Sequence, residues 1–223
     1  MRTVKEASVR RNEILDAAER LFGTNGFEQT STNDLLAEIG IARGTLYYHF
    51  KSKEEILDAM IERISNRLLS KAQTIAADQS IPVLVRLTRI MQAMNVSDPA
   101  GLEVVEQIHK PQNALLHQKM QQHLVCGLTP ILTQVVEEAI DQGLCQTDYP
   151  RQTVEMLLMY ANSSFDDLMD IPPQERLELI QAFIYNLERL FGTQPGVMAK
   201  AVWPIFVPEG QADAAKENQK ENA

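Results

Sequence analysis

The stretch "IARGTLYYHFKSKEE", residues 41–55, decides the fold. On a helical wheel its central part places Leu46 and Phe50 together on an inward face, and it places Gly44 and Tyr48 on the opposite face. The outward face is therefore small, hydroxylated and aromatic, with cationic side chains before and after it. Such a surface is an unusual one for a helix that serves only a hydrophobic core.

Two further helices are expected before this one. The sequence "STNDLLAEIG" combines Ser31 and Asp34 in the spacing of a capping box, and Gly40 is expected to end that short helix. Upstream, "RRNEILDAAERLFGTNGF" has the apolar spacing of one helical stripe and is expected to stop near Gly26. Two short helices joined by a glycine-containing turn, with a third helix in front, predict a helix-turn-helix unit.

The outward face suits the major groove of DNA. A glycine lets the helix backbone come close, hydroxyl groups bond phosphate oxygens, and an early arginine such as Arg43 reaches guanine edges. Lys53, at the start of the next helix, adds its charge to the amide donors there and is expected to contact a phosphate. The alternative is a solvated face with a packed aromatic pair.

The run from Phe27 to Leu57 resembles the DNA-binding segment of the TetR family of bacterial transcriptional regulators, and the resemblance covers roughly residues 10–60. It implies that Arg43 and Gly44 lie on base edges, with Asn33 a further base contact. It also implies phosphate contacts from a second group of positions: Thr32, Thr45, Tyr47, Tyr48, His49 and Lys53. For Tyr47 a core-edge role is the alternative, and for His49 a local bond. Leu36 replaces the usual small alanine, and Ala42 replaces a serine that commonly caps the recognition helix.

The charge of the chain is unevenly distributed. The net charge is −9, yet residues 1–71 hold 11 of the 21 Lys and Arg residues and 11 of the 30 Asp and Glu residues. All the excess negative charge therefore lies beyond residue 71. An acidic protein is a poor general binder of nucleic acid, but a neutral segment with grouped cations still presents a local positive face.

Helical periodicity continues to the C-terminus, so the predicted fold is all-α. Prolines before or within first turns mark helix starts, and Pro130 either starts a helix or kinks a continuous one. Long helices are expected at 151–169 and 173–191. The expected domains are a helix-turn-helix domain at 1–53 that starts the long connecting helix, a helical ligand-binding and dimerisation domain at 54–192, an apolar extension at 193–208 and a disordered tail at 209–223.

The resemblance further implies a pocket within the helical bundle and a homodimer through the last two long helices. Apolar stripes on these helices give the expected dimer interface: Val154, Leu157, Leu158, Ala161, Phe165, Leu168, Ile180, Phe183 and Leu187. Methionines are adaptable pocket residues, although at helical spacing they more often belong to a core. Those considered for a ligand are Met91, Met94, Met120, Met156 and Met159.

The sequence thus predicts a cytoplasmic, ligand-responsive repressor that binds double-stranded DNA at a palindromic operator as a homodimer, released by a small-molecule inducer. No cofactor, metal or membrane partner is expected, because the histidine and cysteine spacing fits none and no long apolar run occurs. The alternatives are an activator of the same fold, an enzyme carrying a helix-turn-helix, and an interaction module that binds a protein through its apolar C-terminal segment.

Overall fold

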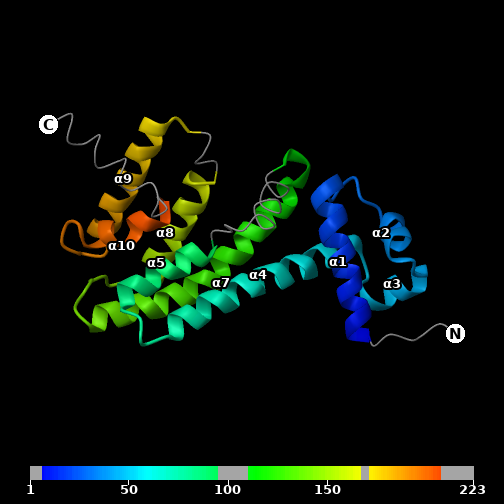
Figure 1. The fold of residues 1–223 in the computed structure, drawn as a ribbon, viewed down its shortest axis with the longest axis horizontal. Coiled ribbons are helices and arrows are strands. Elements are labelled where there is room, and N and C mark those ends of the chain that lie inside the picture. Colours follow the sequence, from blue (N-terminus) through cyan, green and yellow to red (C-terminus); the bar gives the residue numbers. More distant parts are fainter. Residues whose placement is uncertain (1–6, 95–109, 167–170, 207–223) are drawn as a thin grey trace. The chain divides into compact units, whose positions relative to one another are not determined.

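The computed structural model describes residues 7–94, 110–166 and 171–206, and within these ranges every regular element is helical (Figure 1). The predicted all-α fold is confirmed. Leu168 and the tail at 209–223 lie outside the described residues. The elements are α1 (Ala7–Asn25), α2 (Thr32–Ile39), α3 (Arg43–His49), α4 (Lys53–Ala77), α5 (Val83–Met94), η1 (Pro111–Asn113), α7 (Ala114–Asp141), α8 (Pro150–Ser164), α9 (Pro173–Leu190) and α10 (Val197–Phe206).

Prolines start three of these elements, η1, α8 and α9, as expected. Pro130 instead lies inside the 28-residue α7, so a helix start there is excluded and the continuous-helix alternative holds. The helix expected to reach residue 169 ends at Ser164. Its last turn carries Asn162, Ser163 and Ser164, whose side chains compete for backbone hydrogen bonds and favour a helix end.

The described helices form two compact units, and both α4 and α7 contribute to each of them. The first unit holds α1, α2, α3, α4 up to Leu68, η1, and α7 up to Leu124. The second holds the remainder of α4 and α7 together with α5, α8, α9 and α10. The two units meet in α4 between Leu68 and Leu69, which is later than the domain boundary expected after residue 53. The functional boundary at residue 53 stays a prediction.

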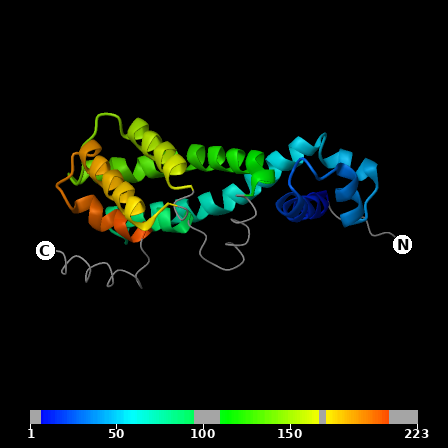
Figure 2. The same ribbon diagram turned by 90° about the horizontal axis from the view of Figure 1, so that it is seen from above.

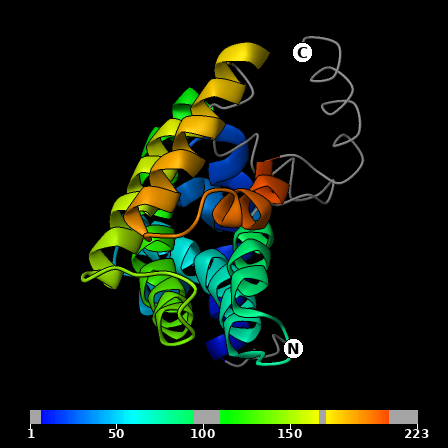
Figure 3. The same cartoon turned by 90° about the vertical axis from the view of Figure 1, so that its left-hand side faces the viewer.

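Each unit has its own apolar core. In the first, Phe22 of α1, Leu35 of α2 and Leu46 of α3 are buried together with residues of α4 and with Met120 of α7. In the second, residues of α4, α5 and α7 pack with the inner faces of α8, α9 and α10. Stacked and edge-on rings of Tyr160, Phe165 and Phe183 join α8 to α9, which lie side by side in Figure 3.

The apolar C-terminal segment forms α10, which packs on α5 and α9 of its own chain. The Glu188 carboxylate accepts hydrogen bonds from the backbone N–H groups of Gly196, Met198 and Ala199, and so caps the start of α10. The Phe206 ring meets Phe165 edge-on at 4.9 Å. Over 197–206 this apolar segment therefore packs on the body of its own chain. No described helix is long and apolar enough to cross a membrane.

Candidate nucleic-acid interface

A tight turn sets α3 against α2. Ser31 and Asp34 form the predicted capping box: the Asp34 N–H donates to the Ser31 hydroxyl at 3.3 Å, and the Ser31 N–H donates to the Asp34 carboxylate at 2.8 Å. The hydrogen bond from the Ser31 backbone is the largest cause of a lowered Asp34 pKa. Gly40 ends α2 in the left-handed conformation, with φ of 68°. Only Ile41 and Ala42 then separate Gly40 from α3.

The two faces of α3 differ as the helical wheel predicts. Leu46 and Phe50 are 1% and 2% exposed, whereas Tyr48 is 78% exposed. Gly44 is also exposed, and a Cβ added to it would meet no atom within 4 Å. The predicted inward and outward sets are confirmed. Ala42 makes no side-chain cap to α3, as its replacement of a capping serine implies.

The two side chains predicted to read bases are bonded to each other. A guanidinium nitrogen of Arg43, at the start of α3, donates to the amide oxygen of Asn33 on α2 at 2.8 Å. Both residues are exposed. This bond joins the two short helices and orients the arginine, while other donors of its five-donor fork stay available.

Lys53 is tied into the unit more closely than the sequence indicates. Its ammonium donates to the backbone oxygens of Phe27 and Thr30, at 2.8 and 3.1 Å, and lies 4.2 Å from the centre of the Phe27 ring. These contacts hold the loop between α1 and α2 against the start of α4. One of the three ammonium donors is left for a phosphate.

The other predicted phosphate contacts lie on the surface beside these residues. Tyr47 is 46% exposed, and Thr32, Thr45 and His49 are half-buried. The His49 ring meets the Tyr48 ring edge-on at 5.0 Å. The sequence analysis did not single out the contact of Arg11, whose guanidinium carbon lies 4.9 Å from the centre of the Phe50 ring. It places a cation of α1 beside the end of α3.

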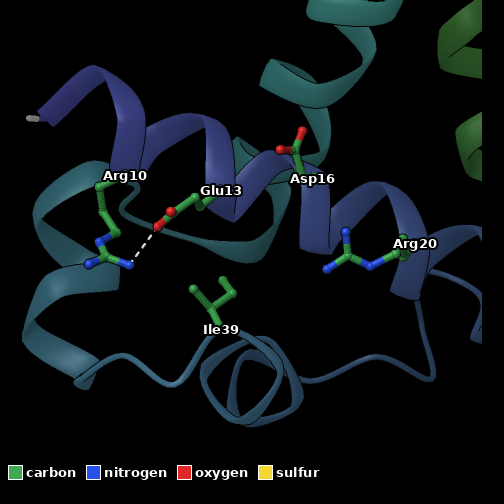
Figure 4. A pocket seen from close by; sticks show the side chains of 5 residues that line it. All are labelled: Arg10, Glu13, Asp16, Arg20 and Ile39. Atoms are coloured by element: carbon green, nitrogen blue, oxygen red, sulfur yellow. Dashed lines mark hydrogen bonds and ion pairs between the residues drawn. The ribbon is translucent and has the colours of Figure 1, made fainter. Parts of the chain in front are cut away.

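Figure 4 shows a pocket of about 240 Å³ between α1 and α2, with Arg10 and Arg20 toward opposite ends and Ile39 between them. Its charged side chains are bonded to acidic or basic neighbours. Arg10 donates to Glu13, and Arg20 donates to Glu38 on α2. We assign no ligand to this pocket, because its charges already neutralise one another.

The five methionines considered for a ligand do not gather at one place. Met120 is buried in the core of the first unit, where its sulfur accepts a hydrogen bond from Ser65. Met91 and Met94 are partly buried against the core of the second unit. Met156 and Met159 lie on the surface of α8, 50% and 59% exposed.

The residues expected at a dimer interface lie mainly inside the second unit. Val154, Leu158, Ile180, Phe183 and Leu187 are all less than 10% exposed, and Leu157, Ala161 and Phe165 are partly buried against the same core. In this arrangement their side chains offer little surface to a partner. The large apolar side chains that α8 and α9 leave exposed are different ones: Met156, Met159, Tyr160, Tyr185 and Leu190.

Known proteins resemble both parts of the chain. A family model described as bacterial regulatory proteins of the tetR family matches residues 14–60, and a tetracyclin repressor-like C-terminal domain matches residues 97–180. The HTH-type transcriptional repressor KstR2 of Mycolicibacterium smegmatis is 32% identical over 91 residues, which are 41% of this chain and 44% of that protein. The chain thus spans less than half the length of this relative.

Two further likenesses cover more of the chain. The HTH-type transcriptional regulator YfiR of Bacillus subtilis, itself uncharacterized, is 26% identical over 72% of this chain and 80% of its own. The structure of SmeT, the repressor of the Stenotrophomonas maltophilia multidrug efflux pump SmeDEF, superposes with a TM-score of 0.60 at 24% identity, over 89% of this chain and 94% of that one. At this identity the structural likeness establishes the fold.

A short helix with an exposed, open face, set by a tight glycine turn against a second helix, defines a helix-turn-helix protein. The two family models, which match residues 14–60 and 97–180, identify the family of this helix-turn-helix protein. The chain belongs to the tetR family of bacterial regulatory proteins.

Proposed function

We propose that this protein is a ligand-responsive repressor that binds a palindromic operator as a homodimer and is released by a small-molecule inducer. The observation that carries the proposal is the exposed face of α3, where Arg43, Gly44 and Tyr48 lie together without packing against the core. Relatives named as repressors support the direction of regulation. In this account Arg43 reads base edges, and Gly44 lets the α3 backbone approach them.

The remaining predicted contacts position the protein on the phosphate backbone. Tyr47, Tyr48 and Thr45 carry hydroxyl groups on or beside the exposed face, and Lys53 adds a cation at the start of α4. Phosphate contacts fix register and orientation, while base contacts carry the sequence information. A single helix-turn-helix has few contacts, so a two-fold dimer that reads half-sites about 34 Å apart, or a multiple of that, is the expected binding form.

The exposed apolar side chains of α8 and α9 support a homodimer. Met156, Met159 and Tyr160 share one face of α8, and Tyr185 projects from α9 with 62% of its surface exposed. Met156, Met159 and Tyr160 are neighbours on α8, and neighbouring exposed apolar side chains are typical of protein interfaces. We therefore assign the partner contact to these side chains, and the more deeply buried stripe of the same helices to the core of each subunit.

The second unit is the proposed inducer-binding part. A structure of a SmeT–triclosan complex provides the precedent of a bound small molecule on this fold. An inducer that lowers operator affinity about 100-fold must bind the DNA-free conformation more tightly by roughly 2.7 kcal/mol. We propose that it acts by tilting α4, so that the two reading helices no longer match the half-site separation.

Selection from a pool of random DNA duplexes tests the proposal. The purified protein is titrated against the pool at two salt concentrations, and the bound duplexes are sequenced. We expect a palindrome, bound by one dimer, with affinity that falls steeply with salt. Uniform, weak binding to all sequences would refute the operator-reading function.

A further inference from the structure

Aromatic side chains of three helices meet in the second unit. Phe165, at the end of α8, and Phe183 of α9 lie edge-on, with their ring centres 5.1 Å apart. The ring of Phe206, in the last turn of α10, lies edge-on to these two rings at 4.9 and 6.2 Å. Phe165 and Phe206 are half-buried, so the contact lies at the edge of the core. We call Phe165 and Phe183 the ring pair, and Phe206 packs on it.

The helix that carries Phe206 is attached more firmly at its start than at its end. α10, orange-red in Figure 2, packs on α5 and α9, and Glu188 caps its first turn. In its middle, the buried Thr88 hydroxyl of α5 donates to the backbone oxygen of Ala201. In the last turn, the exposed Gln92 side chain donates to the oxygen of Pro204 at 3.2 Å. Pro204 has no N–H, so this turn lacks one helical hydrogen bond.

Local opening of the last turn would uncover groups that a small molecule can satisfy. Helix ends with solvent-exposed hydrogen bonds open at a lower free energy than the core does. If Phe206 moves away, the ring pair loses an aromatic contact and the Gln92 amide loses its acceptor. An aromatic ring restores the first interaction, and an acceptor oxygen restores the second. The Phe206 ring and the Pro204 carbonyl thus present the chemistry of the molecule that would replace them.

We propose that the ring pair and Gln92 form a binding site for a small aromatic molecule with a hydrogen-bond acceptor, and that the last turn of α10 occupies this site when the molecule is absent. The inference rests on the proposed function and names the chemical class of its inducer. All the residues involved belong to the second unit. Because the molecule must displace Phe206, its apparent affinity is reduced by the fraction of the protein in which the last turn is open.

The first test uses three probes with the unmodified full chain. Acetophenone has an aromatic ring and a carbonyl, isopropylbenzene has a methyl group in place of the carbonyl oxygen, and cyclohexyl methyl ketone lacks the aromatic ring. We expect acetophenone to bind at least about fivefold more tightly than either of the others, measured by ligand-observed NMR titration. Equal affinities for the three probes would overturn the proposed chemistry of the site.

The displacement of the last turn is measured on the same protein. We expect acetophenone to raise amide hydrogen exchange over residues 203–206 about threefold or more, because it binds only when the turn is open. Exchange over the core of α9 should stay unchanged. A bound probe that leaves exchange over 203–206 unaltered would refute the occupation of the site by α10.

Three variants then test the individual residues. Phe206→Ala removes the occupant and should raise the affinity for acetophenone about tenfold or more. Phe191→Ala is the matched control: it deletes a ring from the same core outside the ring pair, and an apolar cavity alone can bind an aromatic molecule. Gln92→Leu, at an exposed position, should abolish the preference for acetophenone over isopropylbenzene.

An affinity of Phe206→Ala equal to that of the wild type, or an equal gain in Phe191→Ala, would overturn the proposal. If a variant fails to fold, the two measurements on the wild type still decide it, and neither uses DNA. Acetophenone is finally added to the wild type bound to its selected palindrome. Binding at the site without release from the palindrome would refute the inducer role, whereas a wild type that selects no palindrome would refute the proposed function alone.

Discussion

Gly44 lies on the exposed face of α3, where an added Cβ meets no atom within 4 Å. Replacing it with alanine should therefore leave the fold intact and raise helix stability by about 0.5–1 kcal/mol, since glycine is a poor helix former. In the proposed complex with DNA, the same methyl group would prevent close approach of the backbone. We predict that Gly44→Ala raises the unfolding midpoint and weakens operator binding at least about tenfold, measured by urea unfolding and a binding titration. Unchanged operator affinity would argue against close approach at this position.

Lys53 makes contacts within the fold and is also a proposed phosphate contact. Lys53→Met removes the donor to the Phe27 and Thr30 oxygens. A hydrogen bond that involves a charged group contributes about 1.5–3 kcal/mol, and less where the group is partly exposed. We predict that the variant loses roughly 1–3 kcal/mol in the free energy of unfolding. We also predict that the slope of log affinity for DNA against log salt concentration becomes shallower by about one, because one phosphate contact is lost. Lys51→Met, at an exposed position, is the control for stability. A stability equal to the control would mean that these two bonds contribute nothing to the fold.

Contacts between individual side chains were the feature least predictable from the sequence. The inward and outward residues of α3 follow from spacing alone, because seven residues make two turns. The Arg43–Asn33 bond depends on the angle between two helices, which spacing does not give. The burial of Arg86 has one sequence signal, since Arg86 lies at i+3 from Val83 and i−4 from Ile90, on the buried face of α5. Its partners, the Ala76 carbonyl of α4 and Glu138 of α7, come from tertiary packing.

At the scale of single helices, the capping box of α2 gives a prediction about pH. Hydrogen bonds from Ser31 lower the Asp34 pKa, so the carboxylate stabilises the fold fully above the ordinary pKa of aspartate. This contribution is lost as the pH falls through the lowered pKa, when the carboxylate is protonated. We predict that Asp34→Asn flattens the acidic part of the stability profile, measured by thermal unfolding between neutral and acidic pH. Parallel profiles for the variant and the wild type would exclude a role for the cap.

Helix starts and ends could be predicted where one residue dominates the local backbone. Gly26 and Gly40 have positive φ and follow the ends of α1 and α2, and Pro150 and Pro173 open α8 and α9. The end of α8 at Ser164 was not predicted, because apolar spacing continues beyond it. Pro130 lies inside α7 and does not mark a helix boundary. Proline removes one backbone hydrogen bond, but the residues before and after it, such as Leu128 and Ile131, are buried in the core and stabilise the helix there.

For the whole molecule, periodicity revealed that α8 and α9 carry apolar stripes but not which surface each stripe covers. The stripes that include Val154 and Leu158 of α8 and Phe183 of α9 lie in the chain's own core. Met156 and Met159, considered for a ligand, lie on the surface. The spacing of apolar residues shows that a helix has an apolar face but not what covers that face. Spacing alone therefore does not distinguish core residues from interface residues.

The dimer proposal predicts the effect of charge on that surface. Met159→Glu places a carboxylate on a side chain that is 59% exposed in one subunit, so the fold of the subunit should persist. In a dimer the same carboxylate would be buried without a partner, which is strongly unfavourable. We predict a shift from dimer to monomer in sedimentation, with Gln118→Glu at an exposed position of α7 as the charge-matched control. A dimer that survives the Met159 change would place the interface elsewhere.

The central claim is that α3 reads DNA sequence through Arg43, and one measurement tests it most directly. The affinities of the wild type and of Arg43→Ala are determined on the selected palindrome and on a scrambled duplex at the same salt concentration. The account predicts that Arg43→Ala loses about 1–3 kcal/mol more on the palindrome than on the scrambled duplex, so that the ratio of the two affinities falls. Equal losses on both duplexes would contradict base reading by Arg43 and leave it only a general contact to the DNA backbone.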